Sequence, residues 1–402
     1  MSDYHIHIGH HFFGAGNVGD DLMMAGFLLA AKRYMPGVRL TCCTPHDRSS
    51  QALRFPEVEW LPYDRATREQ CVRSCDVWLG LGDSPFHAEI GSWFLDHLIQ
   101  EMQICQRFSK PMFFLGVGVN DALALKRPQT RALAEYADHI WTRDQESAAG
   151  LAALCGWEKV TAGADLAHIY LRGYSFEAES DNVIAFVLNF EDQSAFSKEA
   201  LCQLIARAGE GRYLWLVQEV RLLPGSELSI YHQLSPSCQA RLELCVPDYK
   251  GASTSGLLAA WGAPPSVIVT SRYHGAVTGA WMGSRVVAVT RNFKVQGAVS
   301  QLGLSNILAF TSLPSIMEGI RVSHAVPRST LDALADLADA CCSSFFRLCR
   351  SGVQIGHEPT ISFKARVGIC WDRLLYRGRL GRWLRRLMRS LGSRVVGGGR
   401  VL

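Results

Sequence analysis

The sequence lacks the long apolar segment of a membrane-spanning protein. Its longest apolar run, Leu22–Ala31, is far shorter than the roughly 20 residues that cross a bilayer as a helix. Residues 1–30 also lack a basic start followed by an apolar segment, so we expect no secretory signal. Hydrophobic residues make up 48% of the chain and charged residues 19%, which excludes intrinsic disorder and a coiled coil as the main state.

Cysteine and histidine patterns typical of metal sites are missing as well. The thirteen cysteines are scattered, no two form a C-x-x-C pair, and the adjacent pairs at 42–43 and 341–342 are unsuited to ordinary disulfides. The histidines at positions 5, 7, 10 and 11 have no carboxylate or cysteine at ligand spacing. We therefore expect reduced thiols, as in a cytoplasmic protein, and no metal.

Positive charge is concentrated at the C-terminus. Residues 364–402 hold eleven Lys and Arg and one acidic residue, Asp372. This segment carries a net charge of +10, so the remaining residues carry −6 of the total of +4. The body of the protein therefore has no basic excess for nucleic acid, and only the tail is suited to a polyanion.

Short apolar segments alternate with helical patterns along most of the chain, which predicts β-α-β units and parallel sheets. A length of 402 residues suits two domains. We predict an α/β protein with two Rossmann-like, doubly wound domains that face a cleft. The predicted divisions are an N-terminal domain over 1–171, a linker over 172–181, a C-terminal domain over 182–350 and a basic tail over 351–402 that contains an amphipathic helix.

A glycine-rich loop lies between the first expected strand and the first expected helix. Residues Gly14–Gly19 match G-x-G-x-x-G, the fingerprint of dinucleotide-binding proteins. The expected second strand, however, runs into Thr44 and Pro45 instead of an acidic residue that could bind a ribose. Asp20 and Asp21 also place negative charge where a pyrophosphate would sit. We favour a glycine turn with Asp20 as the helix cap over an NAD site.

Cationic side chains follow two neighbouring expected strands in the second half. Arg272 and His274 lie between the strand Ser266–Thr270 and a helix, and Lys294 follows the next strand. Ligands of open α/β sheets bind at such strand ends. The three residues therefore predict a pocket for a small polyanion, and the alternative is an Arg–carboxylate pair beside a surface histidine. Arg143, at a similar strand end in the first half, has the same two interpretations.

The order of these motifs resembles the polysaccharide pyruvyl transferase family. The similarity covers roughly residues 9–303 and consists of G-x-G-N-x-G-D at 14–20, G-x-G at 116–118, R-D-x-x-S at 143–147, A-D at 164–165, S-R-Y-H-G at 271–275 and Lys294. Tyr273 replaces the usual leucine. The chain also has Leu81–Phe86 (LGDSPF) where the family often has a glycine-rich turn, which suggests a different acceptor sugar.

The resemblance implies a fold, a reaction and a set of site residues. The fold is glycosyltransferase-B-like, the donor is phosphoenolpyruvate as co-substrate, and the acceptor is a glycan or lipid-linked oligosaccharide that receives a cyclic pyruvate ketal. The N-terminal domain would form the acceptor side and the C-terminal domain the donor side. His274, Arg272 and Lys294 would be catalytic, Arg143 would join Arg272 and Lys294 in donor binding, and the remaining motif positions would be Asn17, Asp20, Asp144 and Asp165.

Three other functions share parts of this pattern. A glycosyltransferase that uses a nucleotide sugar would have the same architecture, and a dehydrogenase would use the Gly14–Gly19 loop. A non-catalytic partner in a polysaccharide assembly complex would keep the fold without the reaction. The donor that the protein consumes distinguishes among them.

The tail contains an amphipathic pattern. Between Leu380 and Leu391 the apolar residues lie three and one positions apart, and four arginines occupy the opposite helical face. A basic face opposite Trp383 and leucines is typical of a helix that lies on anionic lipids, although a partner-binding helix has the same pattern. We expect a cytoplasmic protein held peripherally at the inner face of the membrane.

We predict that the full chain sediments with anionic liposomes and not with neutral ones, because the arginines need negative headgroups. A chain that ends at Thr360 should stay in the supernatant. Equal partitioning of both chains, or no binding at low salt, would rule out the membrane role of the tail.

Overall fold

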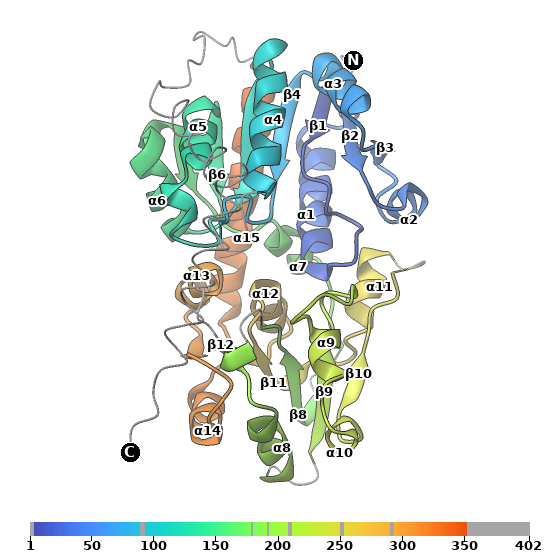
Figure 1. The fold of residues 1–402 in the computed structure, drawn as a ribbon, viewed down its shortest axis with the longest axis vertical. Coiled ribbons are helices and arrows are strands. Elements are labelled where there is room, and N and C mark those ends of the chain that lie inside the picture. Colours follow the sequence, from blue (N-terminus) through green and yellow to red (C-terminus); the bar gives the residue numbers. More distant parts are fainter. Residues whose placement is uncertain are drawn as a thin grey trace, which may run out of the picture.

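Two parallel β-sheets, each between layers of helices, form the framework of the protein (Figure 1). The computed structural model describes residues 4–88, 93–177, 180–190, 193–207, 211–249, 253–289 and 293–351. The first sheet consists of β1 (His5–Ile8), β2 (Arg39–Thr44), β3 (Val58–Pro62), β4 (Val77–Leu81), β5 (Met112–Val117), β6 (His139–Thr142) and β7 (Val160–Ala162). The second consists of β8 (Ser180–Val187), β9 (Arg212–Leu216), β10 (Glu243–Cys245), β11 (Pro265–Thr270), β12 (Arg285–Val289) and β13 (Ser305–Ile307).

Both sheets have the same topology. The strand orders are β3-β2-β1-β4-β5-β6-β7 and β10-β9-β8-β11-β12-β13, with every pair parallel. In each sheet the order reverses beside the first strand, between β1 and β4 and between β8 and β11. Ligands of doubly wound proteins bind outside the carboxyl ends of the strands at this reversal.

Helices cover both faces of the sheets. Those of the first half are α1 (Val18–Tyr34), α2 (Arg48–Arg54), α3 (Arg65–Ser74), α4 (Trp93–Arg107), α5 (Pro128–Tyr136), α6 (Gln145–Cys155) and α7 (Ala167–Arg172). Those of the second half are α8 (Lys198–Arg207), α9 (Glu227–Tyr231), α10 (Pro236–Gln239), α11 (Thr254–Ala259), α12 (Tyr273–Trp281), α13 (Phe293–Leu302), α14 (Leu313–Val322) and α15 (Arg328–Arg350). Short 3-10 turns occur at Ala124–Lys126, Trp157–Lys159 and Gln193–Ala195.

Burial on both faces explains the near-continuous apolar strands. In β5, Phe113 and Leu115 pack into the hydrophobic cluster that contains α1, whereas Met112 and Phe114 pack into the cluster on the α4 side. Because successive side chains of a strand point to opposite faces, a strand covered on both sides reads as one apolar run. The predicted pair of doubly wound α/β units in a glycosyltransferase-B-like fold is confirmed.

The last described helix, α15, connects the two halves. It begins after α14 of the second half and runs along the first half, where it contacts α1, α7 and β5 (Figure 1, orange). Phe345 packs 5.8 Å from the Phe113 ring, and Phe346 stacks on Phe27 at 5.7 Å. Asp339 accepts hydrogen bonds from Arg33 and Tyr34 of α1. The hydrophobic core of the first half is therefore completed by the end of the described chain.

The predicted amphipathic helix at 380–391 and nearly all of the basic tail lie outside the described residues. Within the described residues, no helix combines the length and apolar character needed to cross a bilayer.

Candidate functional site

A cavity of about 580 Å³ lies where the carboxyl ends of the two sheets meet. Its walls come from the loops after β1 and β4 in the first half and after β8, β11 and β12 in the second. These loops include both strand-order reversals. The cavity therefore occupies the position at which doubly wound sheets present ligands.

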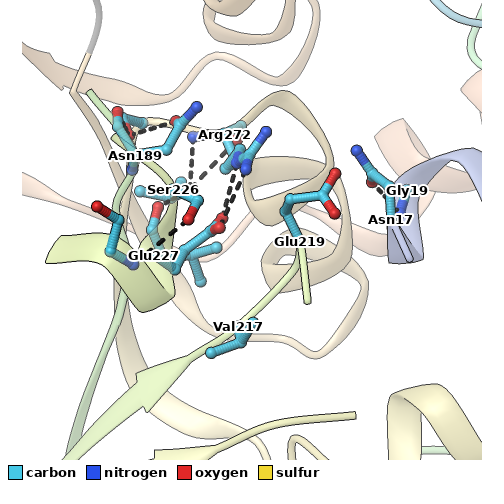
Figure 2. A network of polar contacts seen from close by, with 12 residues as sticks. Asn17, Gly19, Asn189, Val217, Glu219, Ser226, Glu227 and Arg272 are labelled. Atoms are coloured by element: carbon cyan, nitrogen blue, oxygen red, sulfur yellow. Dashed lines mark hydrogen bonds and ion pairs between the residues drawn. The ribbon is translucent and has the colours of Figure 1, made fainter. Parts of the chain in front are cut away.

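Arg272 enters the cavity from the end of β11, immediately before α12. Its Nε and Nη2 donate to the two carboxylate oxygens of Glu227 at 2.7 and 3.0 Å, and Glu227 is fully buried (Figure 2). This bidentate pair fixes the plane of the guanidinium and leaves Nη1 for a ligand. The Arg–carboxylate pair that the sequence analysis gave as an alternative does form, but Arg272 also lines the cavity.

His274 is the second residue of α12 and is buried, so the surface-histidine alternative is wrong. Its Nε2 is 3.3 Å from Oδ2 of Asp165, which belongs to the first half. Burial lowers the pKa of His274, and the Asp165 carboxylate partly offsets this. Burial acts in the opposite direction on Asp165, yet its pKa is held at about 2 because His274 and Arg143 lie beside it.

Gly19 allows His274 to reach its position. A Cβ atom at Gly19 would lie 2.0 Å from Nδ1 of His274, well inside contact distance. The missing side chain lets the imidazole approach the first turn of α1 from the opposite half of the protein. The glycine that ends the fingerprint-like motif is therefore required by a histidine more than 250 residues away in the sequence.

Lys294, in the first turn of α13, also lines the cavity. Burial, and then the positive charge of Arg143, lower the pKa of Lys294, while Asp83 and Asp20 raise it in part. Burial and the Asp83 charge raise the pKa of Asp20 well above its usual range. Among the described residues Lys294 forms no ion pair within 4 Å, so its ammonium is the cation of the cavity without a close partner.

Asp83 occupies the turn at which the chain departs from the family pattern. It follows Gly82, and both residues have positive φ, +58° for Gly82 and +60° for Asp83. Positive φ is costly for a residue with a side chain, although Asp tolerates it better than most. The strained turn places a carboxylate in the cavity, where it faces Lys294 and Asp20.

Arg143 lies behind the cavity wall and is completely buried. Its Nη2 donates to Ser84 Oγ at 2.8 Å, and its guanidinium lies 4.2 Å from the centre of the Tyr273 ring. Ser84 and Tyr273 are the groups that line the cavity there. Asp144 caps α6 by accepting from the Ser147 amide at 2.7 Å. Arg143 thus influences the charged groups of the site through space and supports its wall.

The Gly14–Gly19 loop joins the two halves. The Gly16 carbonyl accepts from the Val220 amide at 2.8 Å, and the Val18 amide donates to the Gln218 carbonyl at 2.9 Å. Asn17 caps α1 through the Gly19 amide, so the expectation that Asp20 is the cap was wrong (Figure 2). A pyrophosphate would need these amides, which the protein itself already occupies.

The histidines near the start are parts of the core. His5 and His7 both bond to Thr41 Oγ1, at 2.8 and 3.0 Å, and His10 Nδ1 lies 2.9 Å from the Leu81 carbonyl oxygen. Burial lowers the pKa of His7 to about 3 and that of His10 to about 4. In the described part of the chain, no group of three His, Cys, Asp or Glu residues is arranged to hold a metal ion.

Several residues at or behind the cavity wall were not found from the sequence. Asp83 lies in the turn after β4, and Glu227 is the buried first residue of α9, where it holds Arg272. Arg221 pairs with its neighbour Glu219 through two contacts of 2.8 and 2.7 Å. Asp83 was visible only as a departure from the family pattern. Glu227 and Arg221 follow the strand β9, so the rule that strand ends carry function would have singled out their region.

The comparisons with known proteins agree with this geometry. A family model described as polysaccharide pyruvyl transferase matches residues 17–292. No curated protein matches the chain. A putative UDP-N-acetylglucosamine 2-epimerase from Listeria monocytogenes has a similar structure, with a TM-score of 0.58, 10% identity and coverage of 90% of this chain and all of that one. HepE from Anabaena, solved with UDP-glucose, has a TM-score of 0.52 at 12% identity and covers 87% of this chain and 98% of its own. At such low identity these structures show the fold.

We predict that Asp165→Asn lowers the pKa of His274 further, because the change removes the negative charge that opposes the effect of burial. Ring resonances of His274 followed by NMR against pH would show this. Asp332→Asn is the control, because Asp332 is an exposed aspartate that pairs with Arg328. This change should leave the titration of His274 unchanged. An unchanged or raised His274 pKa in Asp165→Asn would contradict the assignment of this ion pair.

Proposed function

Because the chain belongs to the polysaccharide pyruvyl transferase family, we propose that it moves the pyruvyl group of phosphoenolpyruvate onto two hydroxyls of a sugar, forming a pyruvate ketal. Membership implies a transferase with a polysaccharide acceptor. The acceptor in the proposal is a polysaccharide or its lipid-linked precursor. The observation that carries the proposal is the meeting of Arg272, His274 and Lys294 in one cavity between the two sheets.

The charges of the cavity suit a small molecule with a phosphate and a carboxylate. Lys294 has no close partner among the described residues, and Arg272 keeps part of its guanidinium free beside Glu227. Arg143, behind the wall, adds a third positive charge. Such a group of cations offsets the charge of the bound donor and of the phosphate as it leaves.

Proton transfer falls to His274 in this proposal. Protonated His274 gives a proton to the methylene carbon of phosphoenolpyruvate, which leaves C2 electron-poor and open to the first sugar hydroxyl. The hydroxyl proton returns to the imidazole as the C–O bond forms. The second hydroxyl then displaces phosphate at C2, and its proton leaves with the phosphate. One hydroxyl proton thus replaces the proton that His274 gave to the new methyl group, and the other leaves on phosphate.

The lowered pKa of His274 fits this role once the donor binds. Burial, Lys294 and Arg143 all disfavour the imidazolium. A bound donor with several negative charges would counteract those cations and raise the pKa of His274. We therefore expect proton uptake with donor binding. Asp20, whose pKa is raised, is a second group in the cavity that can exchange a proton with the acceptor.

The deciding experiment supplies the full-length protein with phosphoenolpyruvate and a panel of model and lipid-linked glycans. The proposal requires release of phosphate coupled to a mass gain of one pyruvyl group on the glycan. Release of UDP from a nucleotide sugar would instead support a glycosyltransferase, and turnover of NAD a dehydrogenase. Inertness towards all donors would support a non-catalytic partner. The membrane contact of the tail is a separate proposal.

Single substitutions test the roles of the three residues. We expect His274→Ala to lower kcat by about 10²–10⁴-fold with a small effect on donor affinity, because a general acid acts in the transition state. Arg272→Ala and Lys294→Ala should mainly raise the KM for phosphoenolpyruvate, since they remove contacts to its charged groups. Wild-type turnover in His274→Ala would exclude it as the acid.

Glu227 is expected to position Arg272. Glu227→Gln should raise the KM for phosphoenolpyruvate by about tenfold with little change in kcat, because one oxygen of the bidentate acceptor becomes a donor that faces Nη2. Glu243→Gln is the matched control. Glu243 also forms two contacts with an arginine, Arg212, but at the exposed edge of the second sheet, so this change should leave the KM unchanged. Tighter donor binding in Glu227→Gln would show that Glu227 competes with the donor instead.

A further inference from the structure

The two walls of the cavity differ in chemistry. The second half contributes the cations Arg272, Lys294 and Arg221 together with the rings of Phe190 and Tyr273, whereas the first half contributes three neighbouring rings, those of Phe12, His87 and Trp93. We call these three rings the aromatic shelf. We propose that the aromatic shelf binds the acceptor by stacking against one face of a pyranose ring. The identity of this ring as the acceptor rests on the proposed function.

The aromatic shelf is supported from below by one buried ring. Phe94 is inaccessible to solvent and lies 5.0 Å from Phe12, 5.3 Å from Trp93 and 5.9 Å from His87, with the His87 ring nearly parallel to it. Phe12 and Trp93 meet edge to face, with centroids 6.2 Å apart and planes at 84°. Edge-to-face and offset contacts are the favourable arrangements of aromatic rings. The shelf is therefore a fixed surface and not a set of independent side chains.

The exposure of Trp93 indicates that this surface is used. Eight tryptophans lie in the described residues, and six of them are buried. Trp93 is 46% exposed and lines the cavity, whereas Trp157, at 56%, lies outside its lining. Only a ring with an open face can stack on a ligand.

A sugar fits the aromatic shelf better than the donor does. Phosphoenolpyruvate is small and highly charged, and its charges require the cations on the other wall. A pyranose presents C–H groups on its faces and hydroxyls around its edge, which suits an aromatic platform with polar groups beside it. Asn120 lines the cavity next to the shelf, and its side-chain amide forms no hydrogen bond with other described residues. That amide can both donate to and accept from sugar hydroxyls.

The test compares Trp93→Ala with Trp157→Ala, which removes another exposed tryptophan, outside the cavity lining. We expect Trp93→Ala to raise the acceptor KM by about tenfold while the KM for phosphoenolpyruvate stays within twofold, and Trp93→Phe to recover most of the loss. Trp157→Ala should match the wild type in both. Equal acceptor KM values in the two alanine variants would overturn the proposal.

A binding measurement keeps this test independent of catalysis. Saturation-transfer NMR of the full-length protein with the methyl glycosides of glucose, galactose, mannose and N-acetylglucosamine should show contact through ring C–H protons, lost in Trp93→Ala and kept in Trp157→Ala. Should the wild type not consume phosphoenolpyruvate, the proposed function fails while this measurement still decides the shelf. Binding of UDP that depends on Trp93, or no Trp93-dependent binding of any glycoside, would overturn the sugar assignment.

Discussion

The site depends on the backbone contact between the loop after β1 and the segment after β9. Two hydrogen bonds, between Gly16 and Val220 and between Val18 and Gln218, hold the first turn of α1 against the second half. This contact sets the distance across which Asp165 meets His274, and the absence of a side chain at Gly19 lets the imidazole fit there. Without this placement of the two halves, neither would present a complete site, because each supplies only part of the charged groups.

Two arginines of the cavity are compensated by carboxylates of the protein itself. Arg272 rests on Glu227 and Arg221 on Glu219, so two of the cations on the second wall are neutralised in place. Burying such pairs gains little stability, because removing charge from water costs about as much as the attraction returns. Their value is geometric: a guanidinium fixed at two points has its remaining donors aimed in one direction before any ligand arrives.

Much of the fold and part of the site could be predicted from the sequence, because parallel strands covered on both faces are apolar runs and functional residues follow them. The strand predicted at Ser266–Thr270 lies within one residue of its observed bounds, Pro265–Thr270. Strands of three residues, such as Glu243–Cys245, carry too little pattern to be recognised in the sequence.

Arg272, His274 and Lys294 could be located from the sequence because the end of an expected strand precedes each of them. Their partners could not: Glu227 is 45 residues from Arg272 in the sequence, and only the folded chain shows that Arg143 lies behind the wall. The residue-level roles therefore remain predictions.

The path of α15 has a consequence for how the protein is made. Phe345 and Phe346 fill the space between Phe27, Phe113 and Trp141, all of which leave the ribosome more than 200 residues earlier. N-terminal domains usually fold first during synthesis. Here the first half cannot close its core until the whole second half has been translated. At typical elongation rates this leaves its apolar surface uncovered for tens of seconds. The nascent chain is therefore a natural client for chaperones, and fragments that stop before α15 expose a surface prone to aggregation.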